Sequence, residues 1–213
     1  MLRHALLLLL CLFPPLLPAA PQDEDLAYSL GVRLGERLRT EVPDLPIDEL
    51  VAGLRQAYLD QPLRLPEQRI DALLENHEAN IANLRQEQAQ QAEGRFLARE
   101  KAVYGVRELA GGVLVRELRA GTGERPGANS RVRVSYRGEL ADGRLFDQSE
   151  GPQWFRLGAL IPGWQTALRQ MPTGARWRVV IPSAQAYGEE GAGDLIPPDA
   201  PLVFEVELLE VAN

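Results

Sequence analysis

Apolar residues in the first half of the chain recur with the period of a helix. From Leu26 to Leu38 a leucine stands at every fourth position, and the same spacing returns from Leu50 to Tyr58. Pro43–Pro46 separates the two runs, and proline interrupts a helix because it has no backbone N–H to donate. We therefore predict two short helices ahead of residue 66.

A third helical segment begins at Pro66, since proline is tolerated in the first turn of a helix. Its apolar stripe alternates spacings of four and three, the narrow seam along which helices pair: Ile70, Leu74, His77, Ile81 and Leu84. Beyond this stripe, RQEQAQQAEGR favours a solvated connecting helix, with a disordered glutamine-rich linker as the alternative. Short apolar helices ahead of a long stripe indicate a surface completed by a second chain, so we predict a homodimer.

From Gly111 onward the period changes to two. Residues 132–136, 177–181 and 204–208 each alternate apolar with polar side chains, which is typical of strands with one buried face. One short helical stretch, Trp164–Met171, lies between the strands. The predicted fold class is α+β: a C-terminal antiparallel half-barrel sheet wrapped on one short helix, preceded by an all-α region and a long connecting helix.

The first twenty residues have the pattern of a secretory signal. Arg3 supplies a positive start, Ala5 to Phe13 an apolar core, and Ala19 and Ala20 small residues for cleavage. The run is too short to span a bilayer, and no later segment is apolar enough to do so. We predict export to the periplasm or cell envelope. Cleavage near Ala20 also removes Cys11, unless that cysteine is lipidated, which is the competing interpretation.

Composition excludes several classes of chemistry. The net charge of −7 is unfavourable for nucleic acid, because phosphate contacts need clustered positive charge. After the signal the chain keeps His77 and no cysteine, which removes Ser-His-Asp and Cys-His machinery and the common zinc sites. His77 itself fits a hydrogen-bonded interface residue, with a pH-sensitive interface group as the alternative. We expect no metal and no cofactor.

Four stretches of the second half carry a specific resemblance. They are VSYRGELADGRLFD (134–147), ALIPGWQTAL (159–168), MPTGARWRVVIPSAQAYG (171–188) and LIPPDAPLVFEVELL (195–209). In this order they resemble the FKBP family of peptidyl-prolyl cis–trans isomerases. The stretch DLAYSLGVRLG (25–35) and the long helix resemble the dimerisation region of its exported Mip-like branch. After the signal peptide predicted over 1–20, we expect a helical dimerisation domain over 21–85, a connecting helix over 86–107 and an isomerase domain over 108–213.

The resemblance also implies a role for individual residues. Tyr187 would donate its hydroxyl to a carbonyl beside the proline, Asp147 would lie beside the rotating carbonyl, and Ile161 would offer its backbone N–H. Trp164 would form the floor of the pocket. Its walls and two rims would be formed by the other residues assigned to substrate binding: Tyr136, Phe146, Leu160, Leu195, Ile196 and Phe204. Taken singly, Tyr136, Trp164 and Phe204 would equally suit an ordinary core.

The implied substrate is a proline-containing unfolded or partly folded polypeptide, and macrolide FKBP inhibitors are possible ligands. An apolar pocket suits this reaction, because the twisted amide has lost its resonance and is less polar than the planar one. A chaperone that grips such segments with little catalysis is the alternative, and a host-directed role stays open.

The sequence departs from the family pattern in two places. The segment 148–155 is short and lacks an arginine to pair with Asp147, and Ala192 stands where some members have histidine. Either Trp154 or Phe155 could supply the second pocket phenylalanine.

Overall fold

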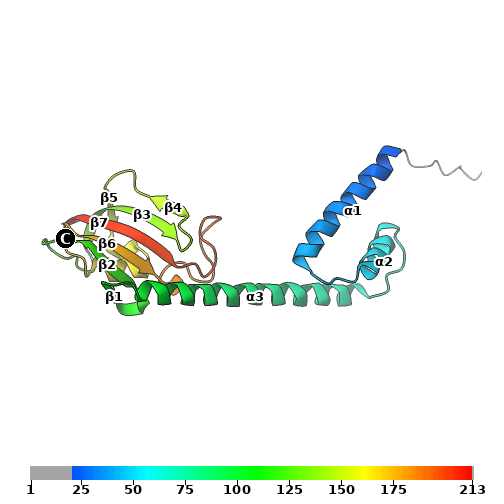
Figure 1. Cartoon of the computed structure of the whole chain (residues 1–213), viewed down its shortest axis with the longest axis horizontal. Coiled ribbons are helices and arrows are strands. Elements are labelled where there is room, and N and C mark those ends of the chain that lie inside the picture. The colour runs from blue at the N-terminus through cyan, green and yellow to red at the C-terminus, as the bar shows by residue number, and fades with distance from the viewer. Residues whose placement is uncertain (1–20, 213) are drawn as a thin grey trace, which may run out of the picture. The chain divides into compact units, whose positions relative to one another are not determined.

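The computed structural model describes residues 21–212, so the predicted signal over 1–20 lies outside the described residues. The chain divides into two compact units at the boundary between Ile70 and Asp71 (Figure 1). No helix among residues 21–212 is both long enough and apolar enough to cross a membrane.

The first unit consists of the two short helices expected from the leucine spacing. Helix α1 covers Pro21–Glu41 and α2 covers Ile47–Tyr58. The chain reverses between them at Asp44, whose φ of 65° is in the left-handed region that aspartate tolerates. The large apolar side chains of both helices stay exposed: Leu26, Leu30, Leu34, Val51, Leu54 and Tyr58.

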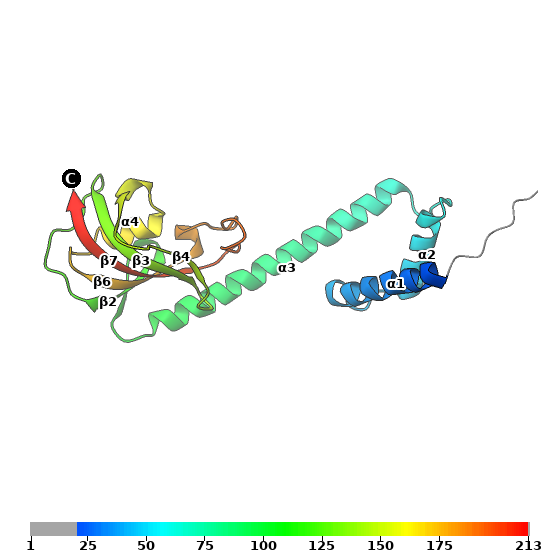
Figure 2. The ribbon, with the colours of Figure 1, turned by 90° about the horizontal axis from the view of Figure 1, so that it is seen from above.

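Helix α3 runs without interruption over Glu67–Lys101, which confirms a helix rather than a disordered linker through the glutamine-rich segment. It ends six residues short of the predicted end at 107, because Gly105 adopts a φ of 81° and β1 begins at Val106. Its last turns are not solvated on all sides. Phe96 is buried against Leu114, Val180 and Val203, so this end of α3 packs on the sheet of the second unit (Figures 1 and 2).

A single antiparallel sheet forms the second unit, as predicted. The strands follow the order β1-β2-β6-β7-β3-β4, and β5 pairs with β3 beside this path. Their bounds are Val106–Glu108 (β1), Leu114–Arg119 (β2), Arg131–Leu140 (β3), Leu145–Gln148 (β4), Gln153–Arg156 (β5), Arg176–Ile181 (β6) and Leu202–Ala212 (β7). Helix α4, Pro162–Leu168, lies in the curve of the sheet (Figure 2), which is the predicted half-barrel on one short helix.

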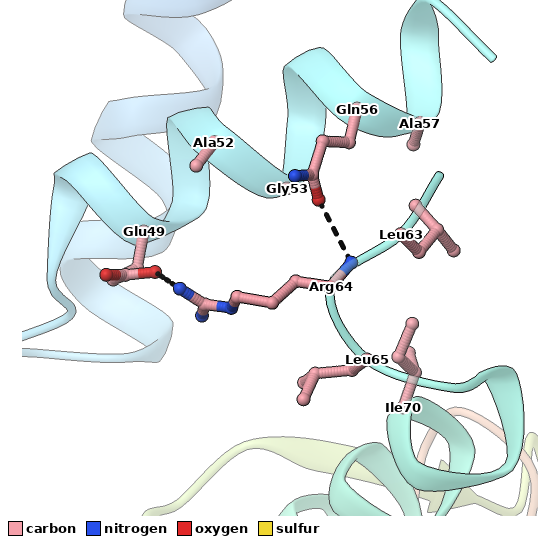
Figure 3. Close-up of a pocket in the computed structure, with 9 residues that line it drawn as sticks. All are labelled: Glu49, Ala52, Gly53, Gln56, Ala57, Leu63, Arg64, Leu65 and Ile70. Atoms are coloured by element: carbon pink, nitrogen blue, oxygen red, sulfur yellow. Dashed lines mark hydrogen bonds and ion pairs between the residues drawn. The ribbon is translucent and has the colours of Figure 1, made fainter. Parts of the chain in front are cut away.

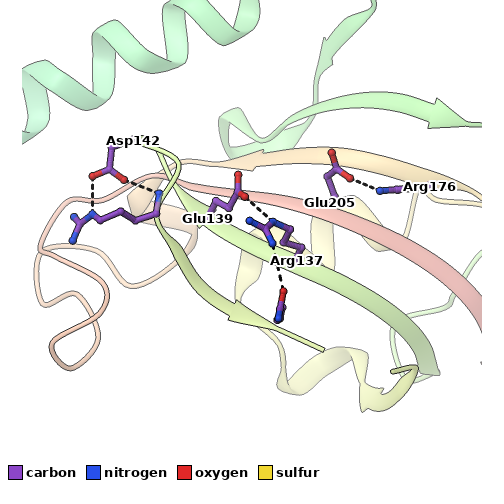
Figure 4. Close-up of polar contacts among 7 residues, drawn as sticks. Arg137, Glu139, Asp142, Arg176 and Glu205 are labelled. Atoms are coloured by element: carbon purple, nitrogen blue, oxygen red, sulfur yellow. Dashed lines mark hydrogen bonds and ion pairs between the residues drawn. The ribbon is translucent and has the colours of Figure 1, made fainter. Parts of the chain in front are cut away.

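The two faces of this sheet differ in character. Val132, Val134 and Leu208 are fully buried on the inner face beneath Leu168 of α4. The outer face carries arginine–glutamate pairs, among them Arg176 with Glu205 at 2.5 Å and Arg137 with Glu139 at 2.7 Å (Figure 4). At such exposure each pair contributes only about 0.2–1 kcal/mol, so the stability of the unit comes mainly from its buried apolar side chains.

Candidate active site

The floor of the site is built by the start of α4. Ile161 is the N-cap residue and Pro162 takes the first helical position, where its missing N–H costs nothing. Gly163 lies directly against Ile181, and a side chain there would overlap the isoleucine. This close approach sets α4 deep in the sheet and leaves Trp164 only 6% exposed.

Three more aromatic rings pack against Trp164 with edges against faces, and a fourth, Phe146, packs in the same way against Phe204. Its ring centroid lies 5.3 Å from that of Tyr136 and 5.1 Å from that of Phe204, at interplanar angles of 88° and 87°. Phe146 reaches Phe204 at 5.6 Å, and Phe155 lies 6.4 Å from Trp164. Each such pair contributes about 0.5–1.5 kcal/mol beyond its buried area, so the five rings hold one another in place.

These rings enclose a cavity of about 230 Å³. It is lined by Tyr136, Phe146, Asp147, Phe155, Ala159, Leu160, Ile161, Trp164, Tyr187 and Phe204. Eight of the ten residues named from the sequence therefore lie together. Leu195 and Ile196 are not among the lining: Leu195 is 62% exposed, whereas Ile196 is 5% exposed and belongs to the core.

Two residues that sequence patterns left open or missed complete the cavity wall. Phe155, not Trp154, faces the cavity, because it pairs with the inward Val132 while Trp154 pairs with the outward Arg133. Gly138 of β3 lies beneath the wall: a Cβ there would stand 2.7 Å from Phe204 and 2.8 Å from Phe146. The glycine therefore makes room for the contact between these two rings.

Polar groups gather at one side of the apolar cavity. The hydroxyl of Tyr136 donates a hydrogen bond of 2.7 Å to Oδ2 of Asp147. Burial raises the pKa of Tyr136 to about 12, and the hydrogen bond and charge of Asp147 add to the effect. Tyr136 therefore remains a neutral donor at physiological pH, and it holds one carboxylate oxygen of Asp147 in a fixed position.

Two donors at the cavity remain available among the residues that the structure describes. Tyr187 is 42% exposed, and its hydroxyl has no hydrogen-bond acceptor among the described residues. The backbone N–H of Ile161 has no acceptor among them either. An N–H at the first turn of a helix has no partner within the helix, so Ile161 is positioned to bind a ligand carbonyl. Over the described part of the chain no cluster of three or more His, Cys, Asp or Glu side chains could hold a metal ion.

Comparison with known proteins accounts for both units. Residues 122–209 match the model of the FKBP-type peptidyl-prolyl cis-trans isomerases, and residues 23–115 match the domain amino-terminal to it. A relative from Pseudomonas aeruginosa, named "Probable FKBP-type 25 kDa peptidyl-prolyl cis-trans isomerase", is 60% identical over 94% of this chain and 87% of its own. The chain belongs to the family of FKBP-type peptidyl-prolyl cis–trans isomerases.

Two further relatives place the chain in the Mip-like branch with an amino-terminal helical domain. The outer membrane protein MIP of Legionella longbeachae is 32% identical over 89% of this chain and 86% of its own. The crystal structure of FkpA from Escherichia coli is 32% identical, with a TM-score of 0.65 over 89% of this chain and 96% of that one. The FKBP fold and isomerase activity expected from the sequence are thereby confirmed.

Proposed function

We propose that the proline of a partly folded, exported polypeptide rotates in the cavity above Trp164. The observation that carries this assignment is the cavity itself: five aromatic rings line a space that has unused hydrogen-bond donors at one side. Rotation about a peptide bond must cross a barrier of about 18–20 kcal/mol, because the C–N resonance is lost at the top. The twisted amide is less polar than the planar one, so a water-poor cavity favours it selectively.

The polar groups act on the carbonyls around the rotating bond. Tyr187 and the N–H of Ile161 donate to substrate carbonyls that must stay still while the imide turns. Asp147, held by Tyr136, places negative charge near the imide oxygen. That oxygen loses partial negative charge as resonance breaks, so repulsion from the carboxylate is relieved in the twisted state. No covalent bond forms and no proton moves in this scheme.

Two neighbouring aromatic residues of β5 provide a matched test. Phe155 lines the cavity, whereas Trp154 points to the opposite face of the same strand. We expect Phe155→Ala to lower kcat/KM for X–Pro peptides by roughly tenfold, since one opened wall admits water and forfeits an aromatic pair. Trp154→Ala should stay within twofold of the unsubstituted chain. Equal losses in both variants would argue against the cavity as the site of rotation.

The second part of the proposal is a homodimer formed through the first unit. Among residues 23–70 no side chain is buried, although most of the stability of a helix in a protein comes from packing of its apolar face. A cavity of about 380 Å³ opens between α2 and the following loop (Figure 3). Ala52, Leu63, Leu65 and Ile70 line it, and an ion pair joins Arg64 to Glu49 at its margin. A second copy that covers these apolar surfaces would supply the missing burial.

Light scattering on variants of α1 and α2 tests the dimer. Leu30→Glu together with Leu54→Glu should give a monomer, because each places a charge on an apolar, exposed face. Arg39→Glu, which changes an exposed side chain of α1 off the leucine stripe, should leave the mass of a dimer. A dimer that survives the double substitution would contradict dimerisation through the apolar faces of α1 and α2.

Export is the third part of the proposal. It rests on the signal pattern over residues 1–20 and on the likeness to a relative named as an outer membrane protein. Mass spectrometry of chain recovered from the periplasm should show a start near residue 21. A chain that keeps residues 1–20, or that stays in the cytoplasm, would contradict it.

A further inference from the structure

The turn that precedes Tyr187 is capped by a side chain from α3. This short 3₁₀ turn, η3, covers Ser183–Gln185, and no side chain of its own segment caps it. Instead, Oε1 of Glu93 accepts a hydrogen bond of 2.6 Å from the backbone N–H of Ser183, and Oε2 accepts one of 2.9 Å from its hydroxyl. Ser183 is 5% exposed, so both of its donors would be buried and unpaired without Glu93.

Ser183 in turn holds the backbone on both sides of Tyr187. Its carbonyl accepts hydrogen bonds from the N–H of Ala186 at 2.8 Å and of Gly188 at 2.9 Å. The carbonyl of Gly188 accepts a further bond of 2.9 Å from the N–H of Asp199, across the loop. The hydroxyl of Tyr187 has no acceptor among the described residues, so these backbone anchors set where it lies.

We propose that Glu93 is a positioning residue for Tyr187, acting through Ser183. The inference rests on the proposed role of Tyr187 as a donor to substrate. Hydrogen bonds to a carboxylate are about twice as strong as neutral ones, and two of them converge on one residue here. A displacement of about 1 Å in a catalytic group can cost a large part of its effect. Helix α3 thereby reaches the active site, although none of its residues lines the cavity.

Glu100, on the same helix, provides the matched control that distinguishes positioning of Tyr187 from a purely structural role of Glu93. Glu93, Phe96 and Glu100 lie on one face of α3, at spacings that bring them onto the sheet together. Glu100 accepts two hydrogen bonds from the guanidinium of Arg178 in β6, and it has no bond to the turn. Loss of Glu100 therefore removes the contact with Arg178 and deletes none of the hydrogen bonds that anchor Tyr187.

The test measures kcat and KM on an X–Pro peptide with the full chain and five variants: Glu93→Ala, Glu93→Gln, Glu100→Ala, Tyr187→Phe, and Glu93→Ala combined with Tyr187→Phe. Removal of the Tyr187 hydroxyl deletes one hydrogen bond and should cost roughly tenfold in kcat. Glu93→Ala should cost about three- to tenfold, mainly in kcat, because it acts only through that hydroxyl. Glu100→Ala should stay within twofold.

The double variant and Glu93→Gln test whether Glu93 affects kcat through the hydroxyl of Tyr187. In the Tyr187→Phe background, Glu93→Ala should cost no more than a further twofold, since the group it positions is already absent. Glu93→Gln keeps an acceptor for the N–H of Ser183 and should recover part of the rate. If Glu93→Ala unfolds the chain, Ser183→Ala removes only the 2.9 Å bond and should still lower kcat two- to threefold.

Three results would overturn the inference. Glu93→Ala with the rate of the unsubstituted chain would show that the cap does not matter. An equal loss in the presence and absence of the Tyr187 hydroxyl would show that Glu93 acts elsewhere. A Tyr187→Phe variant with full activity would remove the proposed donor itself, and with it the reason for positioning, while leaving the cavity as the site.

Discussion

The contact between Phe96 and the sheet makes a quantitative prediction about stability. Phe96→Ala removes a ring that is 8% exposed and packs on Leu114, Val180 and Val203. A buried phenylalanine covers roughly 150–250 Å², which at about 25 cal/mol per Å² amounts to about 4–6 kcal/mol. That is an upper bound, because the unfolded chain already buries part of this surface. Since the cluster is small and at the edge of the core, we expect a loss of about 3 kcal/mol.

Tryptophan fluorescence measures this loss in the second unit alone. All three tryptophans, at 154, 164 and 177, lie within residues 71–213. A loss of about 3 kcal/mol corresponds to a fall in Tm of about 6–12 °C for a unit of this size. Arg95→Ala, an exposed neighbour on α3, should change Tm by no more than about 2 °C, because surface substitutions stay within about 0.5 kcal/mol. Equal shifts in the two variants would refute the packing argument.

The same contact bears on where the isomerase unit begins. A chain that starts at residue 108 lacks Glu93, Phe96 and Glu100, so it loses the apolar cover and both polar anchors. We expect a chain of residues 86–213 to unfold at a clearly higher temperature than one of residues 108–213. Identical unfolding temperatures would support the boundary at 108.

Three further predictions concern the cavity and its charges. Asp147→Asn removes the charge and leaves only a weaker, neutral acceptor for the Tyr136 hydroxyl, so tyrosinate absorbance should appear at lower pH than in the unsubstituted chain; an unchanged titration would contradict the pairing. The pKa of Tyr136 is about 12 in the folded chain, above the ordinary value of 10, so the folded state keeps this proton to higher pH than the unfolded state. The stability that this contributes is present in full below pH 10 and should be lost as the pH rises through 12. Denaturant midpoints that stay constant between pH 10 and 12 would count against this prediction. Gly138→Ala places a methyl group against Phe146 and Phe204, so it should lower the free energy of unfolding by about 1–3 kcal/mol and also lower kcat/KM. Unchanged kinetics would show that the two rings need not touch.

How far the sequence alone could predict the site depends on the local structure around each residue. Tyr136 and Phe204 lie on long strands, β3 and β7, where strict alternation identifies the inner face. Strand β5 has only four residues, too few for alternation to decide between Trp154 and Phe155. The register with β3 decides it, and register is a property of the assembled sheet.

Leu195 and Ile196 show the opposite case, in which neighbours with similar side chains have different surroundings. Ile196 pairs with Ala192 in an isolated bridge and turns into the core, while Leu195 points to solvent. Gly191, with a φ of 66°, lies so close to the backbone of Ile196 that no side chain would fit. Such a turn is defined by contacts within the folded loop, and apolar character alone does not predict it.

The cap on Ser183 could not be predicted from any local pattern. Glu93 lies ninety positions earlier, in a segment whose glutamines and glutamates suggest a helix exposed on every side. The buried face of this part of α3 contains one large ring, Phe96, between two glutamates. Phe96 and its partly buried neighbour Leu97 are too few to form a hydrophobic stripe, so only tertiary packing reveals the docked face.

Catalysis in the cavity above Trp164 can be tested by the rate of cis-to-trans conversion of an X–Pro peptide, measured against the concentration of the full chain. The rate should rise in proportion to the amount of chain, far above the unaided rate, for which isomerisation takes tens to hundreds of seconds. The rate should also be the same in H₂O and D₂O, because no proton is transferred. A rate equal to that in buffer would contradict catalysis by the cavity above Trp164 and leave only binding of proline-containing segments.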